Sequence, residues 1–96
     1  MTRIERIKRM EQYLDEAVSA VSEMNGALDR YLAVRDHIRA LADYYDGGAW
    51  RKDYEADEAG KLPADLKRGV LSQDALYDLL CEDRELLRRL SELEEI

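Results

Sequence analysis

Apolar residues recur along the first third of this sequence at alternating spacings of three and four. This is the spacing of the a and d positions of a coiled coil, and it continues for about four heptads. Because side chains three and four residues apart share one face of a helix, the pattern predicts a helix with a continuous apolar seam. The seam consists of Ile7, Met10, Leu14, Ala17, Val21, Met24, Leu28 and Tyr31.

Local signals mark both ends of this first helix. Thr2 is a good N-cap, and Glu5 three residues later completes a capping box. We expect the helix to end before Gly47 and Gly48, because glycine readily adopts the left-handed conformation that follows a helix. A helix over 2–46 would be about 66 Å long at 1.5 Å per residue. Beyond the four heptads the seam takes two successive steps of three, which shifts its phase, and continues through Val34, Ile38, Leu41 and Tyr45.

The dipeptide Asn25-Gly26 leaves two architectures open. Asn-Gly is a turn signal, and a break here would give three helices of similar length in a three-helix bundle. The heptad phase continues through the dipeptide with no residues left over for a loop, and an interior glycine costs only about 1 kcal/mol relative to alanine. We favour one long helix and keep the three-helix bundle as the alternative.

A second amphipathic helix is expected over 72–95. Ser72 is its N-cap, Asp74 lies in the positive first turn, and Leu71 and Leu76 are placed as a hydrophobic staple. Folded back on the first helix, it would complete a coiled-coil-like helical hairpin. Its own seam consists of Leu76, Leu79, Asp83, Leu86, Leu90 and Leu93.

The unequal lengths of the two helices predict self-association. The shorter helix, about 33 Å long, would cover only half of the longer one. The seam from Ile7 to Val21 would then be exposed, and soluble monomers rarely expose an apolar stripe of that size. We therefore expect a homodimer in which the uncovered halves pair.

Composition favours a single all-α domain over 1–96. The chain has 96 residues, lacks Phe and is 39% charged, as is common in long helices. Its net charge of −7 argues against a nucleic-acid partner, which requires a concentrated basic surface. The charged N-terminus does not resemble a signal peptide and no apolar run reaches the length of a membrane span, so we expect a cytoplasmic protein with no membrane partner. The single cysteine, Cys81, has no second cysteine for an internal disulfide.

Residues 47–71 read as a corner that contains two short helices. The first covers 50–59 and is closed by Gly60. The second begins at Pro63 and is closed by Gly69. The sequence thus predicts two short helical turns between the long helix and its returning partner.

Apolar residues of this corner admit two interpretations. Trp50 and Tyr54 are four residues apart and share one helical face. They form either a plug over the end of the helical pair or an aromatic patch that binds a partner protein. The plug would also contain Leu62, Leu66, Val70 and Leu71.

The charged residues of the corner give a candidate interaction surface. Asp53 and Asp57 lie one helical turn apart with Glu58 beside them, an oxygen-rich set of the kind that binds Mg²⁺ or Ca²⁺. We favour their neutralisation by Lys67 and Arg68, and expect no metal, no cofactor and no catalytic residue. The surface proposed for an unidentified protein partner consists of Trp50, Asp53, Tyr54, Asp57, Glu58, Lys67 and Arg68.

Two pairs of glutamates suggest an alternative function. Glu55 and Glu58, like Glu82 and Glu85, are three residues apart. They distantly resemble the paired carboxylates with which all-α nucleoside-triphosphate pyrophosphatases hold Mg²⁺ against a polyphosphate. The alternative is therefore a small divalent-metal-dependent phosphohydrolase, and it requires the four carboxylates to converge.

One block of the sequence reads W-x-x-D-Y-E-A-D-E-x-G-x-L-P-x-x-L-K-R-G-V-L-S and follows a Tyr-Tyr pair. The residues of the pair and the block that carry the resemblance are Tyr44, Tyr45, Trp50, Asp53, Tyr54, Glu55, Asp57, Glu58, Leu62, Pro63, Leu66, Lys67, Arg68, Gly69, Val70, Leu71 and Ser72. The block resembles a small bacterial domain-of-unknown-function family whose members have a similar length. The resemblance is specific over 44–80 and implies the helical architecture, but it implies no activity, substrate or catalytic role.

Overall fold

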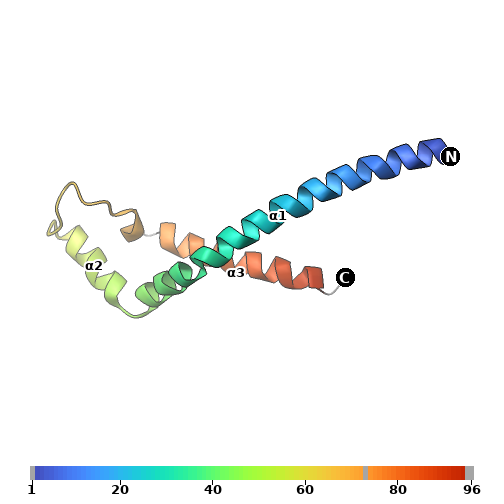
Figure 1. The fold of residues 1–96 in the computed structure, drawn as a ribbon. Coiled ribbons are helices and arrows are strands. Elements are labelled where there is room, and N and C mark those ends of the chain that lie inside the picture. Colours follow the sequence, from blue (N-terminus) through green and yellow to red (C-terminus); the bar gives the residue numbers. More distant parts are fainter. Residues whose placement is uncertain (1, 73, 95–96) are drawn as a thin grey trace. The chain divides into compact units, whose positions relative to one another are not determined.

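The computed structural model describes residues 2–72 and 74–94, and these residues form helices and no strands. The long helix α1 (Arg3–Asp46) is followed by α2 (Ala49–Glu58), the 3-10 helix η1 (Gly69–Leu71) and α3 (Ala75–Glu94) (Figure 1). The predicted all-α class, with a long N-terminal helix before shorter ones, is confirmed. The chain divides into two compact units, Met1–Asp36 and His37–Ile96, and the single domain expected over 1–96 stays a prediction.

The first helix begins at the predicted capping box. The amide of Glu5 donates to Oγ1 of Thr2 at 3.1 Å, and the amide of Thr2 donates to Oε2 of Glu5 at 3.4 Å. These two bonds satisfy backbone donors that have no partner within the helix. A purely local sequence signal therefore determines where α1 starts.

Helix α1 continues through Asn25 and Gly26 without interruption. The turn on which the three-helix bundle depended is not formed. No atom lies within 4 Å of the position that a Cβ would occupy on Gly26. This glycine is therefore not required by packing, and the helix absorbs its low propensity.

The end of α1 at Asp46 also follows the prediction. The amide of Gly47 donates to the carbonyl of Asp43 at 2.8 Å, and a Cβ at Gly47 would lie only 2.8 Å from that same oxygen. Gly48 has φ of 90°, which is the left-handed region that glycine adopts at little cost. The two glycines allow the backbone to turn directly from α1 into α2.

Helix α2 ends as expected. Its last residue is Glu58, and the next residue but one, Gly60, has φ of 71°. The amide of Gly60 donates to the carbonyl of Asp57 at 3.0 Å. This left-handed glycine is the predicted closure of the first short helix.

The second short helix is not where the sequence predicted it. Between Pro63 and Gly69 there is only a turn, in which the amide of Leu66 donates to the carbonyl of Pro63 at 3.2 Å. Gly69 does not have positive φ and is the first residue of η1, so it opens a helical turn instead of closing one. Proline preorganises a first helical turn, but a single turn gains too few hydrogen bonds to offset the cost of nucleation.

The helix α3 starts at its predicted cap and beside the buried core. The amide of Ala75 donates to Oγ of Ser72 at 3.1 Å. Leu71 and Leu76 are 6% and 3% exposed and are the buried side chains among the described residues. They flank Ser72 at the staple positions, and η1 packs against both α2 and α3. The predicted end of this helix at residue 95 lies outside the described residues.

Candidate functional site

The seven residues of the candidate interaction surface all lie in the unit His37–Ile96. Helix α2 carries five of them, and the other two precede η1. Their positions therefore depend on how the corner, residues 47–71, folds. Three side-chain contacts determine that fold.

The first contact involves the only tryptophan. Trp50 stacks on Tyr54 with ring centroids 5.1 Å apart and an angle of 17° between the planes, and it meets Tyr45 at 5.2 Å and 57°. Its indole Nε1 donates to the carbonyl of Val70 at 2.9 Å. Trp50 is half-buried and connects α2 to η1, because it contributes both ring contacts and a hydrogen bond.

The predicted apolar plug is only partly formed. Leu71 is buried and Leu62 is half-buried, but Leu66 and Val70 are 48% and 38% exposed. The prediction that the latter two belong to the plug is wrong. The chain between Pro63 and Gly69 forms no helix, and both side chains remain exposed to solvent.

The second contact joins the last turns of α1 to α2. The hydroxyl of Tyr44 donates to Oδ2 of Asp53 at 2.6 Å. Partial burial disfavours the phenolate, and the Asp53 carboxylate both accepts the phenolic hydrogen and repels a second negative charge, so the pKa of Tyr44 is raised to about 12. Sequence reasoning missed this partner, although Tyr44 belongs to the Tyr-Tyr pair that precedes the block.

The third contact is the ion pair between Asp57 and Arg68. An Nη atom of Arg68 lies 2.5 Å from Oδ1 of Asp57, and the other Nη donates to the carbonyl of Ala64 at 3.4 Å. The side chains of Arg68 and Asp57 are 34% and 22% exposed, so water screens the pair only partly. The predicted neutralisation of α2 carboxylates is thus formed by Arg68, whereas Lys67 makes no ion pair within residues 2–72 and 74–94.

Two open hollows in this corner are both lined in part by Arg68. Their volumes are about 370 Å³ and about 290 Å³, and all the predicted surface residues except Trp50 line at least one of them. The larger is lined by Tyr54, Asp57, Glu58, Arg68, Leu71 and Ser72, and the smaller by Tyr44, Asp53, Leu62, Leu66, Lys67, Arg68, Val70 and Leu71. The fold therefore brings the predicted charged residues together, although two of the carboxylates are already engaged.

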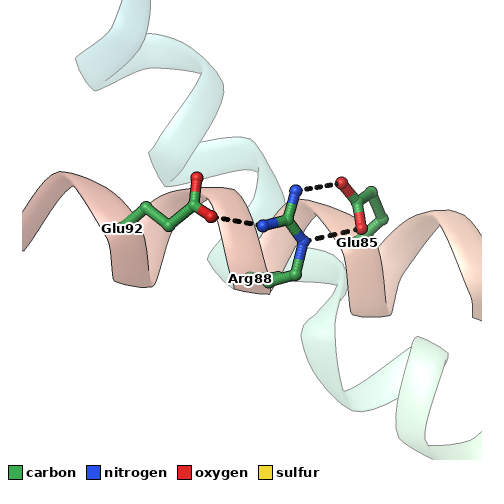
Figure 2. Close-up of polar contacts among 3 residues, drawn as sticks. All are labelled: Glu85, Arg88 and Glu92. Carbon is green, nitrogen blue, oxygen red and sulfur yellow. Dashed lines mark hydrogen bonds and ion pairs between the residues drawn. The ribbon is translucent and has the colours of Figure 1, made fainter.

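The carboxylates of the alternative function do not converge. Among residues 2–72 and 74–94, no three His, Cys, Asp or Glu side chains form a group that could hold a metal ion. Glu85 is instead bound by Arg88 through both carboxylate oxygens, at 2.9 Å from Nε and 2.6 Å from Nη, and Arg88 also pairs with Glu92 (Figure 2). Hydrogen bonding from Arg88 lowers the pKa of Glu85. The arrangement that the phosphohydrolase requires is absent from these residues.

The seam of α1 is the second candidate site. In the unit Met1–Asp36, its side chains are exposed from Ile7 (52%) to Leu28 (40%), and only Tyr31 is half-buried. Large apolar residues beside the seam are exposed as well, including Tyr13, Val18 and Leu32 at 52%, 61% and 53%. We call the seam and these flanking residues the α1 stripe. From Ile7 to Leu28 it is an exposed apolar surface.

Comparison with known proteins identifies the family. A family model described as a domain of unknown function (DUF4298) matches residues 7–93. The chain belongs to the DUF4298 family. Membership confirms the expected small family of unknown function, and the DUF4298 match spans both the α1 stripe and the corner.

Comparisons of this DUF4298 member with curated proteins and with solved structures identify no relative. In the part of the chain that the structure describes, no helix has the length and apolarity to cross a membrane.

Proposed function

We propose that this DUF4298 protein is a self-associating helical interaction module. In this proposal, the α1 stripe of one copy binds the same stripe of a second copy and forms a homodimer. The observation that carries the proposal is the exposure of the seam over four heptads, with Ile7, Leu14 and Val21 at 52%, 55% and 60%. An apolar row of this length at a regular coiled-coil period is suited to an identical helix as its partner.

The charge pattern of α1 agrees with a helix as the partner. Polar and charged residues occupy the face opposite the stripe, where Gln12, Ser19 and Glu23 lie. No charged side chain interrupts the seam itself between Ile7 and Tyr31. Pairing therefore buries apolar surface without desolvating a charge.

The corner supplies the surface for a further, unidentified protein partner in the same proposal. Its two hollows expose charged groups beside apolar ones, and Lys67 contributes a cation that no described carboxylate neutralises. We place the module in the cytoplasm, where the thiol of its single cysteine, Cys81, stays reduced. Self-association and partner binding then use separate surfaces.

Sedimentation equilibrium of the full chain at micromolar concentration tests the self-association. The expected result is a species of about twice 11.2 kDa. The double variant Leu14→Lys/Val21→Lys is expected to sediment as a monomer, because each dimer would bury four uncompensated charges. A wild-type chain that sediments only as a monomer contradicts the proposal.

A matched variant separates a lost interface from a lost fold. Gln12→Lys/Ser19→Lys introduces the same charges on the opposite face of the same helix, and it is expected to remain dimeric. Nuclear magnetic resonance signals of the corner report whether each variant keeps the fold of the unit His37–Ile96. Equal dissociation of both double variants would show that added charge, and not the stripe, controls association.

A further inference from the structure

The sizes of the seam residues differ along α1. The smallest, Ala17, lies near the middle of the seam, and the largest, Tyr31, lies at its end. In a parallel, in-register pair every seam residue faces its own copy. Ala17 would then face Ala17 and leave the centre underfilled, while Tyr31 would crowd against Tyr31.

An antiparallel pair distributes these volumes evenly. When Ala17 faces Val21 of the second copy, the layers above and below join Leu14 to Met24, Met10 to Leu28 and Ile7 to Tyr31. Each layer then combines two residues of different size, and none consists of two alanines or two tyrosines. Alternation of large and small residues across facing positions is how well-packed helical cores are built.

The surface of α1 has a depression at the place where this register needs one. A shallow hollow of about 440 Å³ is lined by Ala17, Val18, Val21, Ser22 and Asn25. The small side chain of Ala17 leaves room beside Val21, which is 60% exposed. Under a two-fold axis between the helices, Val21 of each copy fits beside Ala17 of the other.

The charge distribution of α1 also favours antiparallel over parallel pairing. Residues 3–12 contain four basic and two acidic side chains, and the positive end of the helix dipole lies there too. Parallel pairing places two such ends together. Antiparallel pairing places them at opposite ends of the seam, about 36 Å apart for 24 residues, which exceeds the screening length of about 8 Å in physiological salt.

We infer that two copies of α1 pair antiparallel, with Ala17 facing Val21 of the second copy. The inference rests on the proposed self-association and adds the orientation and the register. It follows that Met10 and Leu28 of different copies lie in one layer. In the same pair, the two Met10 residues lie about 27 Å apart, for 18 residues along the helix.

Disulfide trapping in the full chain tests this register. All variants carry Cys81→Ser, which removes the only native cysteine, and Met10→Cys and Leu28→Cys are introduced separately. Mixed and oxidised, the two variants are expected to form a disulfide between unlike chains. Each variant alone is expected to give little product, because a disulfide needs Cα atoms within about 7 Å. The control Ser19→Cys, on the opposite face, is expected to form no rapid cross-link.

The outcomes distinguish the orientation from the self-association. If Met10→Cys and Leu28→Cys each form like-chain disulfides and the mixture gives no preference for unlike chains, the pairing is parallel and the inference is wrong while the homodimer stands. The register is also wrong if the mixed variants sediment as a dimer when reduced but form no disulfide between unlike chains when oxidised. A sample that sediments as a monomer overturns the proposed self-association and the inference with it.

Discussion

The phenol of Tyr44 donates a 2.6 Å hydrogen bond to the carboxylate of Asp53, and this bond joins the last turns of α1 to α2. The indole of Trp50 and the guanidinium of Arg68 make comparable connections from α2 to the chain around η1. Two of the three bonds have a carboxylate as acceptor, and such charge-assisted bonds are stronger than neutral ones. The corner is therefore positioned by a few specific polar bonds in addition to the small core around Leu71 and Leu76.

Titration of Tyr44 should reveal its bond to Asp53. The folded pKa of Tyr44 is about 12 and the ordinary value is 10.0, so its contribution to stability is fully present below pH 10. Between pH 10 and about 12 the unfolded chain loses this proton while the folded chain keeps it, and stability falls as pH rises. We expect Tyr44→Phe to lose this part of the pH dependence, measured as the difference between the two unfolding curves against pH.

A second variant separates the causes of that shift. Asp53→Asn removes the carboxylate but leaves the partial burial of the phenol, which is the largest cause. The pKa of Tyr44 should therefore fall without returning fully to 10.0. An unchanged pKa, measured by ultraviolet difference titration against Tyr44→Phe, would show that Asp53 does not bind the phenol.

The ion pair of Asp57 and Arg68 should make a modest contribution to stability. Because both side chains are partly exposed, we expect a coupling free energy of about 0.5–1 kcal/mol in a double-mutant cycle with Asp57→Asn and Arg68→Gln. Urea unfolding at low and high salt measures it, and salt should reduce it. The matched control is Lys67→Gln, which should change stability by less than about 0.5 kcal/mol. Equal effects of Lys67→Gln and Arg68→Gln would contradict the pairing.

Replacement of Trp50 should separate its ring contacts from its hydrogen bond. Trp50→Phe keeps an aromatic ring but removes the donor to Val70, and we expect a loss of about 1 kcal/mol. Trp50→Ala also removes the contacts with Tyr45 and Tyr54, and because the site is half-buried we expect about 2–3 kcal/mol. Thermal unfolding measures both. A loss below about 1 kcal/mol for Trp50→Ala would favour the interpretation of Trp50 as a binding patch.

Two glycines of the corner should respond differently to alanine. Gly48 has φ of 90°, and Gly48→Ala should cost about 1–2 kcal/mol from backbone strain alone, since no atom lies within 4 Å of the added Cβ. Gly69 does not have positive φ, and no atom lies within 4 Å of a Cβ added there either. Gly69→Ala should therefore be neutral or slightly stabilising. Chemical denaturation of the two variants checks this contrast. A destabilised Gly69→Ala would mean that this glycine has a role that its backbone does not show.

Local chemistry explains which parts of the fold could be predicted. The capping box of Thr2 and Glu5, the cap at Ser72 and the left-handed Gly60 each involve residues within a few positions of one another. The continuity of α1 through Gly26 followed from the unbroken heptad phase. Such features require no knowledge of what packs against the segment.

Contacts between elements explain what the sequence did not reveal. Tyr44 is nine residues from Asp53, so this partner does not follow from helical spacing. Arg68 was expected to neutralise α2 carboxylates, but its choice of Asp57, eleven residues away, was not. The chain between Pro63 and Gly69 was assigned a helix from its proline and glycine, yet it forms a turn that presents Arg68 to α2. In the same way, the glutamate pairs of the alternative function shared a spacing, but Glu85 is bound to Arg88. The sequence identified the charged residues of the corner, and the fold determined which of them pair.

The environment of Trp50 also gives the protein an intrinsic optical probe. It is the only tryptophan, and its indole is hydrogen-bonded to Val70 and stacked on Tyr54 within the corner. Its fluorescence therefore reports on the corner, while the far-ultraviolet circular dichroism is dominated by the 44 residues of α1. Dilution that separates two copies should alter the circular dichroism and leave the fluorescence of Trp50 unchanged. One unlabelled sample can therefore report on both α1 and the corner.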